Sequence, residues 1–336
     1  MAYVEIGRAF RFQLTTGIGQ SAALSSNTHF PSWSVSDTTV AGIDSTTGVL
    51  IGKKSGSVLV TAAVDGAAPT AEVIVAPGIL VGAGDIASCE STDDEETASL
   101  LDAIAGTVFT AGDNVYEHGT YDEYLTCYDP SWGRHRPRTR PAPGNHEYMT
   151  GNAQGYFQYF ASAAGDSSRG YYSYDLASWH IIVLNSTIDV RQGSAQERWV
   201  RADLAAHPSQ CALAYWHFPR FSSGFQGNHP EMSAIWQALY DAGVDVVVSG
   251  HDHDYERFSP QTASGQIDWT QGIREFVVGT GGKSHLPFQN TVPNSEVRDE
   301  TTFGVLLFKL FDDHYEWKFL PTRPNGFTDS GQAFCH

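Results

Sequence analysis

The sequence predicts an α/β (α+β) domain of two mixed β-sheets, preceded by a small all-β domain. Residues up to Pro77 are rich in Ser, Thr, Gly, Ala and Val and show short alternating apolar runs. From Ile79 onward, strand-like apolar runs alternate with helical patterns and end in a strand-rich tail, which is typical of packed mixed sheets with helices outside. A chain of 336 residues is long enough for one large and one small domain.

The first 77 residues are expected to form a sandwich of antiparallel strands. Alternating runs between turn-rich segments favour strands at 10–14, 49–51, 57–61 and 71–75, with Trp33 as a core aromatic. The stretch 33–41, with Gly48-Val49-Leu50 and Lys54-Ser55-Gly56, resembles the bacterial Ig-like repeats of group 2. We interpret this module as a spacer, or as one that binds a cell-surface or carbohydrate partner. Pro77-Gly78 is the expected joint, so the domains are predicted at 1–77 and 78–336.

The larger domain shows strand and helix patterns in alternation. Strands are expected at 79–83, 107–111, 180–185, 211–216 and 246–248, with a hairpin strand at 171–174 beside 180–185. Helices are expected at 95–104, 196–206 and 233–242. Strands at 274–279, 304–311 and 315–320 are expected to close the sheets.

Several strands of this domain end in a glycine that is followed by a side chain able to bind a metal ion. These junctions are Gly84-Asp85, Gly112-Asp113, Gly144-Asn145-His146 and Gly250-His251-Asp252-His253, and His217 follows a further strand. One Gly-Asp alone is more often a turn or a helix cap. Five such points on consecutive strands indicate a shared site, because glycine allows the sharp turn that aims the next side chain into a cleft.

The run Val246-Val247-Val248 reads as a strand buried on both faces, and His251 and His253 follow after Ser249-Gly250. On extended backbone, residues two apart point the same way, so both imidazoles are expected to face one spot at the carboxyl end of the strand. Open α/β sheets bind their ligands at such ends. Imidazole suits zinc, iron, manganese and other first-row metals.

The donor set mixes oxygen and nitrogen, which suits iron, zinc or manganese better than calcium or a thiolate-bound metal. It contains too many donors for one ion, so Asp113 is expected to bridge two neighbouring sites. Two metal ions about 3.5–4 Å apart form the arrangement that clamps the attacking and leaving oxygens of a phosphoryl displacement.

The ordered motifs at 84–85 (GD), 112–116 (GDNVY), 144–147 (GNHE), His217 and 250–253 (GHDH) resemble the calcineurin-like metallophosphoesterase superfamily over residues 79–336. The resemblance implies a four-layer sandwich of two mixed sheets flanked by helices. The first motif lacks the histidine that is common two residues after its aspartate, whereas Tyr116 lies three residues after Asp113. This substitution is similar to the purple acid phosphatase branch.

The resemblance implies two ligand sets that share Asp113. One ion takes Asp85, Asp113, Tyr116 and His253, and the other takes Asp113, Asn145, His217 and His251. The first ion is expected to be Fe(III), bound by a tyrosinate that gives the colour, because a hard trivalent ion favours loss of the phenol proton. Its neighbour is expected to be Fe(II), Zn or Mn. The alternative is that Tyr116 is an aromatic wall beside a pair of divalent ions.

The implied function is a phosphatase that hydrolyses small-molecule phosphate monoesters by attack of a metal-bound hydroxide. Asp113 and His146 are the catalytic candidates, and His146 is expected to contact the phosphate or to protonate the leaving group. The alternative for His146 is that it only supports the turn. A phosphodiesterase or nucleotidase of the same superfamily is the alternative function. A non-catalytic adhesion or binding protein is a more remote alternative.

Asn145, His146, Arg220 and His229 are the substrate-binding candidates, and Arg220 is expected either to touch a phosphate oxygen or to form a surface ion pair. Plant purple acid phosphatases carry further histidines in the loop after the ligand that His217 matches. Here Phe218 follows directly, and the loop offers only His229. The source of the leaving-group proton is therefore open, with His118 and His285 as candidate substitutes.

The net charge of −18 argues against a nucleic-acid backbone or an anionic membrane as the main partner. No stretch approaches the apolar length of a membrane span. An anionic substrate requires local positive charge in such a field, and bound metal ions are the obvious source.

The four cysteines lie too far apart for a CxxC motif and fit two disulfides in an exported protein, the alternative being buried free thiols. Four cysteines allow three pairings, between which the residues alone do not decide. Cys89–Cys127 with Cys211–Cys335 is the expected pairing. The first residues lack the basic and apolar regions of a signal peptide, so the protein is either cytosolic or has lost its signal. The cysteines and the domain organisation favour a secreted protein.

Overall fold

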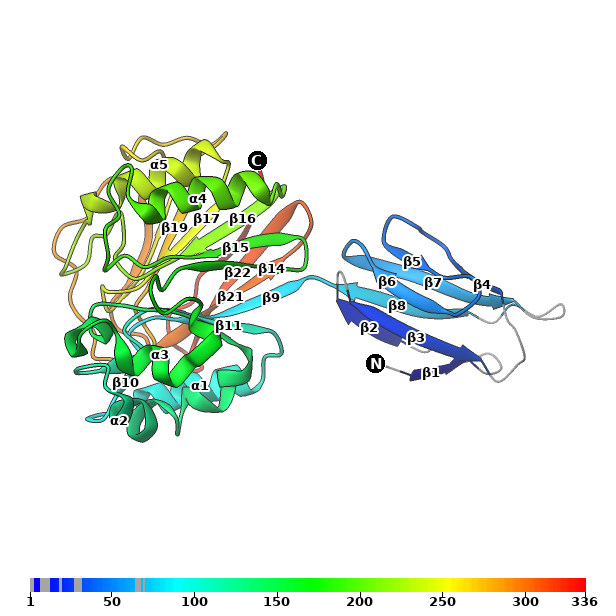
Figure 1. Ribbon diagram of the computed structural model, residues 1–336, viewed down its shortest axis with the longest axis horizontal. Helices are drawn as coiled ribbons and strands as arrows, with labels where there is room; N and C mark the ends of the chain where they lie inside the picture. The colour runs from blue at the N-terminus through cyan, green and yellow to red at the C-terminus, as the bar shows by residue number, and fades with distance from the viewer. Residues whose placement is uncertain (1–2, 7–12, 18–19, 27–31, 64–67, 69) are drawn as a thin grey trace. The chain divides into compact units, whose positions relative to one another are not determined.

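The computed structural model describes residues 3–6, 13–17, 20–26, 32–63, 68 and 70–336. The chain forms two compact units (Figure 1). The smaller unit comprises Met1–Gly78, Leu176–Ser178 and Lys309–Asp313, and the larger comprises Ile79–Asp175, Trp179–Phe308 and His314–His336. The boundary between independently folding domains at residue 77 stays a prediction.

The smaller unit contains two four-stranded sheets. One has the order β1 (Tyr3–Ile6), β3 (Ser21–Ser26), β6 (Val49–Gly52) and β5 (Ala41–Ile43). The other has the order β2 (Gln13–Gly17), β8 (Thr70–Ala76), β7 (Gly56–Ala63) and β4 (Ser32–Val35). The predicted strands at 49–51, 57–61 and 71–75 are therefore confirmed. Residues 10–12 of the predicted strand 10–14 lie outside the described residues.

The two sheets of the smaller unit share one core. Trp33 is 4% exposed and packs in a cluster with Leu50, Val60 and Val73, which confirms it as a core aromatic. The expectation of purely antiparallel strands was wrong, because β1 pairs with β3, and β2 with β8, in parallel. Alternating apolar residues indicate a half-buried strand but carry no information about the direction of its partner. The likeness to a bacterial Ig-like repeat stays a prediction.

The first sheet of the larger unit has six strands and is mixed. Its order is β13 (Thr139–Ala142), β11 (Thr107–Ala111), β9 (Gly78–Ala83), β21 (Gly304–Leu310), β22 (His314–Pro321) and β23 (Ser330–Phe334). Strands β9, β11 and β13 run parallel, whereas β22 and β23 are antiparallel. The carboxyl ends of the three parallel strands therefore lie at one edge of this sheet.

The second sheet has seven strands. Its order is β14 (Tyr172–Leu176), β15 (Trp179–Val183), β16 (Cys211–Tyr215), β17 (Val246–Ser249), β19 (Arg274–Val278), β18 (Tyr255–Phe258) and β20 (Ser295–Asp299). Strands β15, β16, β17 and β19 run parallel, and β18 is antiparallel to both of its neighbours. Two short strands, β10 (Ala87–Ser88) and β12 (Val115–Tyr116), form a separate parallel pair.

The two sheets pack face to face through aromatic rings. Phe276 of β19 lies 5.4 Å from Phe308 of β21 and 5.6 Å from Trp317 of β22, measured between ring centroids. Phe109 of β11 contacts Tyr215 of β16 in the same way, at 5.6 Å.

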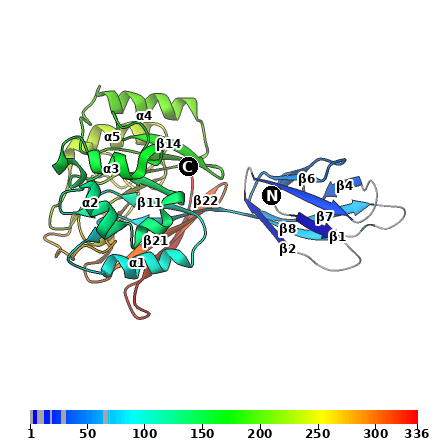
Figure 2. The ribbon, with the colours of Figure 1, turned by 60° about the horizontal axis from the view of Figure 1, so that its bottom comes forward.

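Helices cover the outer faces of the sheets, which gives the four predicted layers. The helices are α1 (Asp93–Asp102), α2 (Tyr121–Glu123), α3 (Gln154–Phe160), α4 (Ala195–Ala206) and α5 (Ser233–Asp241), with short turns η1 (Tyr124–Tyr128), η2 (Trp132–Arg138), η3 (Glu147–Thr150), η4 (Ala161–Ala164) and η5 (Pro230–Met232). Val200 of α4 and Trp236 of α5 belong to the core cluster that includes Ala214 and Val247 of the second sheet. Figures 1 and 2 show α4 and α5 over this sheet and α1 on the side of the first sheet.

One expectation about the sheets of the larger unit was wrong. The strands at 274–279, 304–311 and 315–320 were expected to close the sheets, but β19, β21 and β22 all lie inside them, and the edge strands are β13, β23, β14 and β20. The edge strand β20 was not predicted, because its sequence SEVRD has exposed and half-buried positions in alternation and no apolar face. The predicted helices and the remaining strands agree with the structure to within a few residues.

Both expected disulfides are present. Cys89 pairs with Cys127, and Cys211 pairs with Cys335, with Cα–Cα separations of 5.1 and 5.4 Å. The second bridge joins the start of β16 to the segment after β23, and so links the two sheets of the larger unit covalently. Among the described residues, no helix is both long enough and apolar enough to span a lipid bilayer.

Candidate metal centre

Loops from both sheets of the larger unit bring their side chains into one cluster. The segments that follow β9, β11 and β13 carry Asp85, Asp113 and Asn145, and those that follow β16 and β17 carry His217 and residues 250–253. The backbone N–H of Gly84 donates to the carbonyl of Val278, and that of Gly250 to His217, which joins the strand ends. The cluster therefore lies where the carboxyl edges of the two sheets meet, the place at which α/β sheets bind ligands.

Three residues of this cluster have a left-handed backbone that residues other than glycine rarely adopt. The φ angles are 59° for Asp85, 48° for Asp113 and 72° for His251. Each costs of the order of 1–3 kcal/mol, and such residues gather at functional sites. Two backbone hydrogen bonds support them, from His251 N–H to Asp85 Oδ2 at 2.8 Å and from His146 N–H to Asp113 Oδ1 at 2.9 Å.

Two of the predicted glycines are needed for a reason other than a sharp turn. A Cβ atom on Gly144 would lie 2.2 Å from Asp113 Oδ1, and one on Gly250 would lie 2.6 Å from Asp85 Oδ2. Both glycines have ordinary φ angles, so close approach of a carboxylate excludes a side chain at these positions.

The first group of side chains surrounds the hydroxyl of Tyr116. This hydroxyl donates to Asp85 Oδ1 at 2.7 Å and lies 3.2 Å from Asp113 Oδ2 and 3.3 Å from His253 Nε2. His253 Nε2 lies 3.4 Å from Asp85 Oδ1. The pairing of Ser88 with Tyr116 in the strands β10 and β12 holds the tyrosine in place.

The second group surrounds Nε2 of His217. This atom lies 3.1 Å from Asp113 Oδ2, 3.1 Å from Asn145 Oδ1 and 3.2 Å from His251 Nδ1. Asp113, His217 and His251 offer ligand atoms that all lie within 4.8 Å of one another, so they could hold one metal ion. Asp113 Oδ2 belongs to both groups, because it lies within 3.2 Å of the Tyr116 hydroxyl as well as of His217 Nε2.

The outer nitrogens of two imidazoles fix which nitrogen faces the cluster. His217 Nδ1 lies 2.9 Å from the carbonyl oxygen of Ala111, and His253 Nδ1 lies 2.7 Å from that of Ser284. A carbonyl can only accept, so both Nδ1 atoms carry a proton and both Nε2 lone pairs can point inward. This is the arrangement in which a histidine binds metal through one nitrogen and donates from the other.

The donor atoms of the second group fit a cation between them. His217 Nε2 lies 3.1–3.2 Å from acceptor atoms of Asp113, Asn145 and His251. Acceptor atoms that gather this closely around one point require a positive charge at that point. Burial lowers the pKa of His217, but the carboxylate of Asp113 outweighs it and raises the pKa to about 9. In the bare protein a proton on His217 supplies the charge, and a metal ion would replace that proton.

Burial and the charges of the cluster also shift the pKa values of His251 and Tyr116. Burial, followed by the charge of His217, lowers the pKa of His251 to about 2, so His251 is neutral and offers a lone pair. Burial raises the pKa of Tyr116 well above the ordinary value of a phenol, and the carboxylates of Asp113 and Asp85 raise it further. Only a strongly charged cation in contact with the phenol oxygen would favour its ionisation near neutral pH.

His251 and His253 lie in different groups, whereas the His-x-His spacing on extended backbone predicted that both would face one spot. His251 faces His217, whereas His253 faces Tyr116 and Asp85. The assumption of extended backbone was wrong, because the chain bends after β17 and His251 has a positive φ of 72°. The two rings therefore face two adjoining groups and not one spot.

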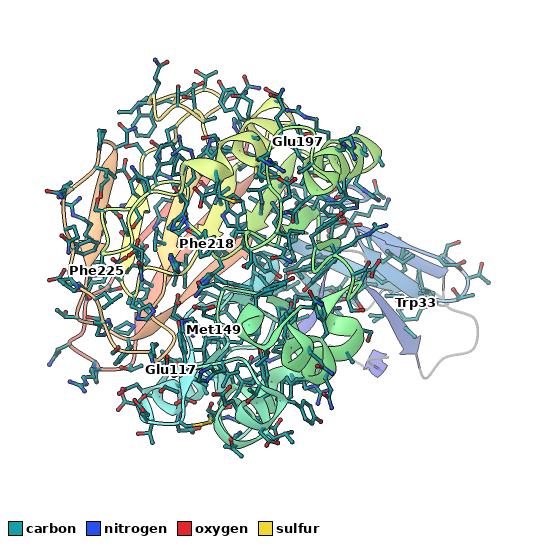
Figure 3. The ribbon with its side chains drawn as sticks, turned by 60° about the vertical axis from the view of Figure 1, so that its left-hand side comes forward. Trp33, Glu117, Met149, Glu197, Phe218 and Phe225 are labelled. Atoms are coloured by element: carbon teal, nitrogen blue, oxygen red, sulfur yellow. A yellow bond between two sulfur atoms is a disulfide. The ribbon has the colours of Figure 1, made fainter. Side chains whose placement is uncertain are left out.

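Two further candidates lie against the cluster. The ring of His146 packs on that of Tyr116 with centroids 4.4 Å apart, and its Nε2 lies 3.8 Å from Asp113 Oδ2. The ring of His229 stacks on Phe218 at 4.5 Å and lies 5.0 Å from that of His251. Figure 3 shows Glu117, Met149 and Phe218 on one face of the larger unit.

Three candidate side chains, those of Arg220, His118 and His285, make their contacts outside the cluster. The guanidinium of Arg220 stacks on Phe221 and donates to the carbonyl of Ala263 at 2.9 Å. His118 is mostly exposed and lies 3.6 Å from Glu123. The ring of His285 stacks on that of Phe303, and its Nδ1 lies 3.3 Å from the carbonyl of His253. The structure does not bring these side chains into the cluster, and their roles stay predictions.

The buried carboxyl of Glu275 holds the backbone at Arg220. Glu275 accepts from the N–H groups of Arg220 and Phe221 at 2.9 and 3.0 Å. Burial raises its pKa from 4.5 to about 8, although these hydrogen bonds and the charge of Arg220 oppose the rise. Between these two pH values the folded chain binds more protons than the unfolded chain, so the free energy of unfolding should fall as pH rises.

We expect Glu275→Gln to remove this dependence, because glutamine does not ionise. The difference in unfolding free energy between wild type and variant should change by at most about 1.4 kcal/mol per pH unit across that window. Chemical denaturation at a series of pH values measures it. Parallel curves for the two proteins would contradict the raised pKa.

Sequence reasoning missed three residues that organise the cluster. Buried Glu147 accepts from the N–H groups of Gly144 and Asn114, at 2.6 and 2.8 Å, and so joins two ligand loops. Asp252 accepts from Gln226 N–H at 2.6 Å and holds the segment that leads to His229. Both carboxylates stand inside recognised motifs, beside ligands, where nothing in the sequence separates a ligand from a residue that binds backbone.

Lys283 is the third missed residue. Its ammonium lies 4.5 Å from the centre of the Tyr116 ring and pairs with Glu117. Its backbone N–H donates to the carbonyl of Asp85 at 2.9 Å. This is a positive charge beside the cluster in a chain of net charge −18, and only its position after two glycines could have drawn attention to it.

Residues 83–255, more than half of the chain, match the model of the calcineurin-like phosphoesterase family. The chain belongs to this family. Two relatives from Arabidopsis thaliana are also similar to this chain. Purple acid phosphatase 22 is 33% identical over 164 residues, which cover 45% of this chain and 37% of that protein. Purple acid phosphatase 15 is 28% identical over 244 residues, which cover 61% of this chain and 45% of that protein.

The chain thus spans less than half the length of these two relatives. Solved structures show the same fold. A purple acid phosphatase from yellow lupin (Lupinus luteus) seeds has a TM-score of 0.64 at 16% identity, covering 90% of this chain and 66% of that chain. A dimetal phosphatase from Danio rerio has a TM-score of 0.58 at 12% identity, covering 78% of this chain and 100% of that chain.

Proposed function

We propose that the chain is a dinuclear metal-dependent phosphatase that hydrolyses phosphate monoesters. The observation that carries this proposal is the position of Asp113 Oδ2, which lies 3.2 Å from the Tyr116 hydroxyl and 3.1 Å from His217 Nε2. One carboxylate thus faces both groups of donors, as a bridge between two ions requires. The family match supports phosphoester chemistry for the same residues.

The two groups of side chains divide the ligands as follows. One ion would be held by Asp85, Asp113, Tyr116 and His253, and its neighbour by Asp113, Asn145, His217 and His251. When bound, the pair of ions supplies positive charge for the phosphate oxygens and lowers the pKa of water, so that hydroxide is available near neutral pH. We propose Fe(III) in the first group, with Fe(II), Zn or Mn in the second.

His146 would donate the proton that the leaving alcohol needs. Its Nδ1 donates to the carbonyl of Glu117 at 2.6 Å, so Nε2 is the nitrogen that can exchange a proton with substrate. The side chain is 19% exposed, which leaves Nε2 within reach of a substrate bound beside Asp113. His229 would hold a phosphate oxygen from the opposite side, where its ring is fixed between Phe218 and Glu231.

Hydrolysis of p-nitrophenyl phosphate and of bis(p-nitrophenyl) phosphate tests the proposal. We expect faster turnover of the monoester by the metal-loaded protein and loss of activity with a chelator. Higher kcat/KM on the diester would make the chain a phosphodiesterase. No activity on either ester, in a protein that retains both ions, would overturn a phosphoesterase function.

We expect Tyr116→Phe to abolish visible colour in the iron-loaded protein, because the colour arises from a phenolate bound to Fe(III). The variant should keep its fold, since Asp85, Asp113 and His253 remain. A visible absorption spectrum is compared with metal analysis of the same sample. Tyr174→Phe is the matched control, because its hydroxyl contacts Tyr215. A coloured Tyr116→Phe protein would assign the chromophore to another residue.

The two disulfides are most stable in an oxidising compartment, so we propose that the protein acts outside the cytosol. The smaller unit carries none of the residues of the cluster, and we propose it as a spacer or attachment module.

A further inference from the structure

A second cluster of metal-capable side chains lies between β15 and the end of α4. His180, Asp203 and His207 each offer one ligand atom, and these atoms lie within 4.8 Å of one another. His180 Nε2 is 2.9 Å from Asp203 Oδ2, and the rings of His180 and His207 stack with centroids 4.8 Å apart. The three residues belong to no ligand set of the candidate metal centre.

Secondary structure places the three side chains together. Asp203 lies in the last turn of α4, and His207 caps that helix four residues later, so both face the same side. Helical metal sites use this spacing of four. His180 comes from β15, whose five residues are all buried, and its side chain is only 3% exposed. The donors therefore come from two rigid elements that pack together.

Neighbouring groups orient the donors in the way that metal sites require. Asp175 Oδ1 lies 2.9 Å from His180 Nδ1, so a carboxylate accepts the proton of the outer nitrogen and Nε2 faces Asp203. The hydroxyl of Ser173 donates to Asp203 Oδ1 at 2.9 Å. Such partners of histidine and carboxylate ligands fix their orientation around an ion.

A buried ion pair explains part of this arrangement but not all of it. A protonated His180 between Asp175 and Asp203 would satisfy those three residues without His207. The ring of His207 nevertheless lies nearly parallel to His180, at 13°, with its Nδ1 2.9 Å from the carbonyl of Asp203. The same Nδ1 lies 3.4 Å from Asp203 Oδ1, so the imidazole that follows α4 also faces the carboxylate.

We propose that His180, Asp203 and His207 bind a divalent transition-metal ion, with Zn²⁺ as the best match. Two imidazoles and one carboxylate are common zinc donors, and water would fill the fourth position of a tetrahedral site. The ion would fasten the C-terminal end of α4 to β15 and would be structural.

Zn²⁺ itself is the probe, and the full metal-loaded protein is the sample. Wild type and His207→Ala are dialysed against the same Zn²⁺ buffer and analysed for metal content. We expect the variant to hold one equivalent less and to keep its activity on p-nitrophenyl phosphate. The side chain of His207 is 51% exposed, so its loss should leave the fold intact. Asp203→Asn should lose the same equivalent.

His314→Ala controls for the loss of any histidine and should retain the wild-type metal content. Added Zn²⁺ should also raise the Tm of wild type by more than that of His207→Ala, because only the folded wild type gains the extra ion. Equal metal content in wild type and His207→Ala would overturn the proposal and leave the ion pair of His180 as the explanation. Loss of activity together with the ion would equally overturn a site separate from the catalytic one.

Discussion

Asp113→Asn is expected to remove both metal ions and to reduce kcat/KM on p-nitrophenyl phosphate by roughly 10³-fold or more, because the ions supply several kcal/mol of transition-state stabilisation. The amide lacks the negative charge that both groups share at Asp113 Oδ2. It also removes the charge that raises the pKa of His217 to about 9 against the effect of burial, so the arrangement of the second group would relax. Metal analysis after purification measures the first effect and steady-state kinetics the second.

Asp189→Asn is the control for the charge change, because Asp189 is a half-exposed carboxylate paired with Arg191. It should keep the metal content and activity of wild type. A protein with asparagine at position 113 that keeps the metal content of wild type would refute the bridging role. One that loses a single equivalent relative to wild type would assign Asp113 to one group only.

His146→Ala is expected to lower kcat by about 10²–10⁴-fold while both ions are retained, since a positioned proton donor contributes this much to catalysis. Nε2 of His146 can exchange a proton with the substrate, because it is Nδ1 that donates to the carbonyl of Glu117 at 2.6 Å. Substrates with better leaving groups need less protonation, so the loss should shrink as the pKa of the leaving alcohol falls. A series of substituted phenyl phosphates measures this trend.

Parallel variants at His118 and His229 separate the candidate histidines. His229→Ala should raise KM more than it lowers kcat, because its ring lies beside that of His251 at 5.0 Å and would bind phosphate. A loss that does not depend on the leaving group would make His146 a residue that positions the turn. Unchanged turnover in His146→Ala, with a large fall in His118→Ala, would move the proton donor to His118.

The ligands of the cluster could be predicted where they belong to a local sequence motif, and not where their position depends on packing between distant segments. A glycine followed by Asp, Asn or His marks a strand end in the sequence, so Asp85, Asp113 and Asn145 were found without a structure. The separation of His251 from His253 depends on the left-handed backbone at residue 251, which a His-x-His motif does not encode. The contribution of two sheets to one site depends on long-range pairing, which period-2 patterns leave open.

Other features lie beyond sequence reasoning for the same reason. Glu147 is fully buried and binds backbone N–H groups of separate loops, yet its position beside a ligand gives no sign of that task. His180 reads as one polar residue in an apolar strand, and only the docking of α4 brings Asp203 and His207 to it. Alternation identified β6, β7 and β8 of the smaller unit, whereas the parallel pairing of β2 with β8 was visible only in the fold.

Each group of donors in the metal centre draws side chains from both sheets, since Asp113 follows β11 of the first sheet and His217 follows β16 of the second. Bound metal ions would therefore hold the two sheets of the larger unit against each other. Because the donors converge only when the two sheets are docked, the complete centre exists only in the folded chain. Proteases should digest the demetallated form sooner than the loaded one.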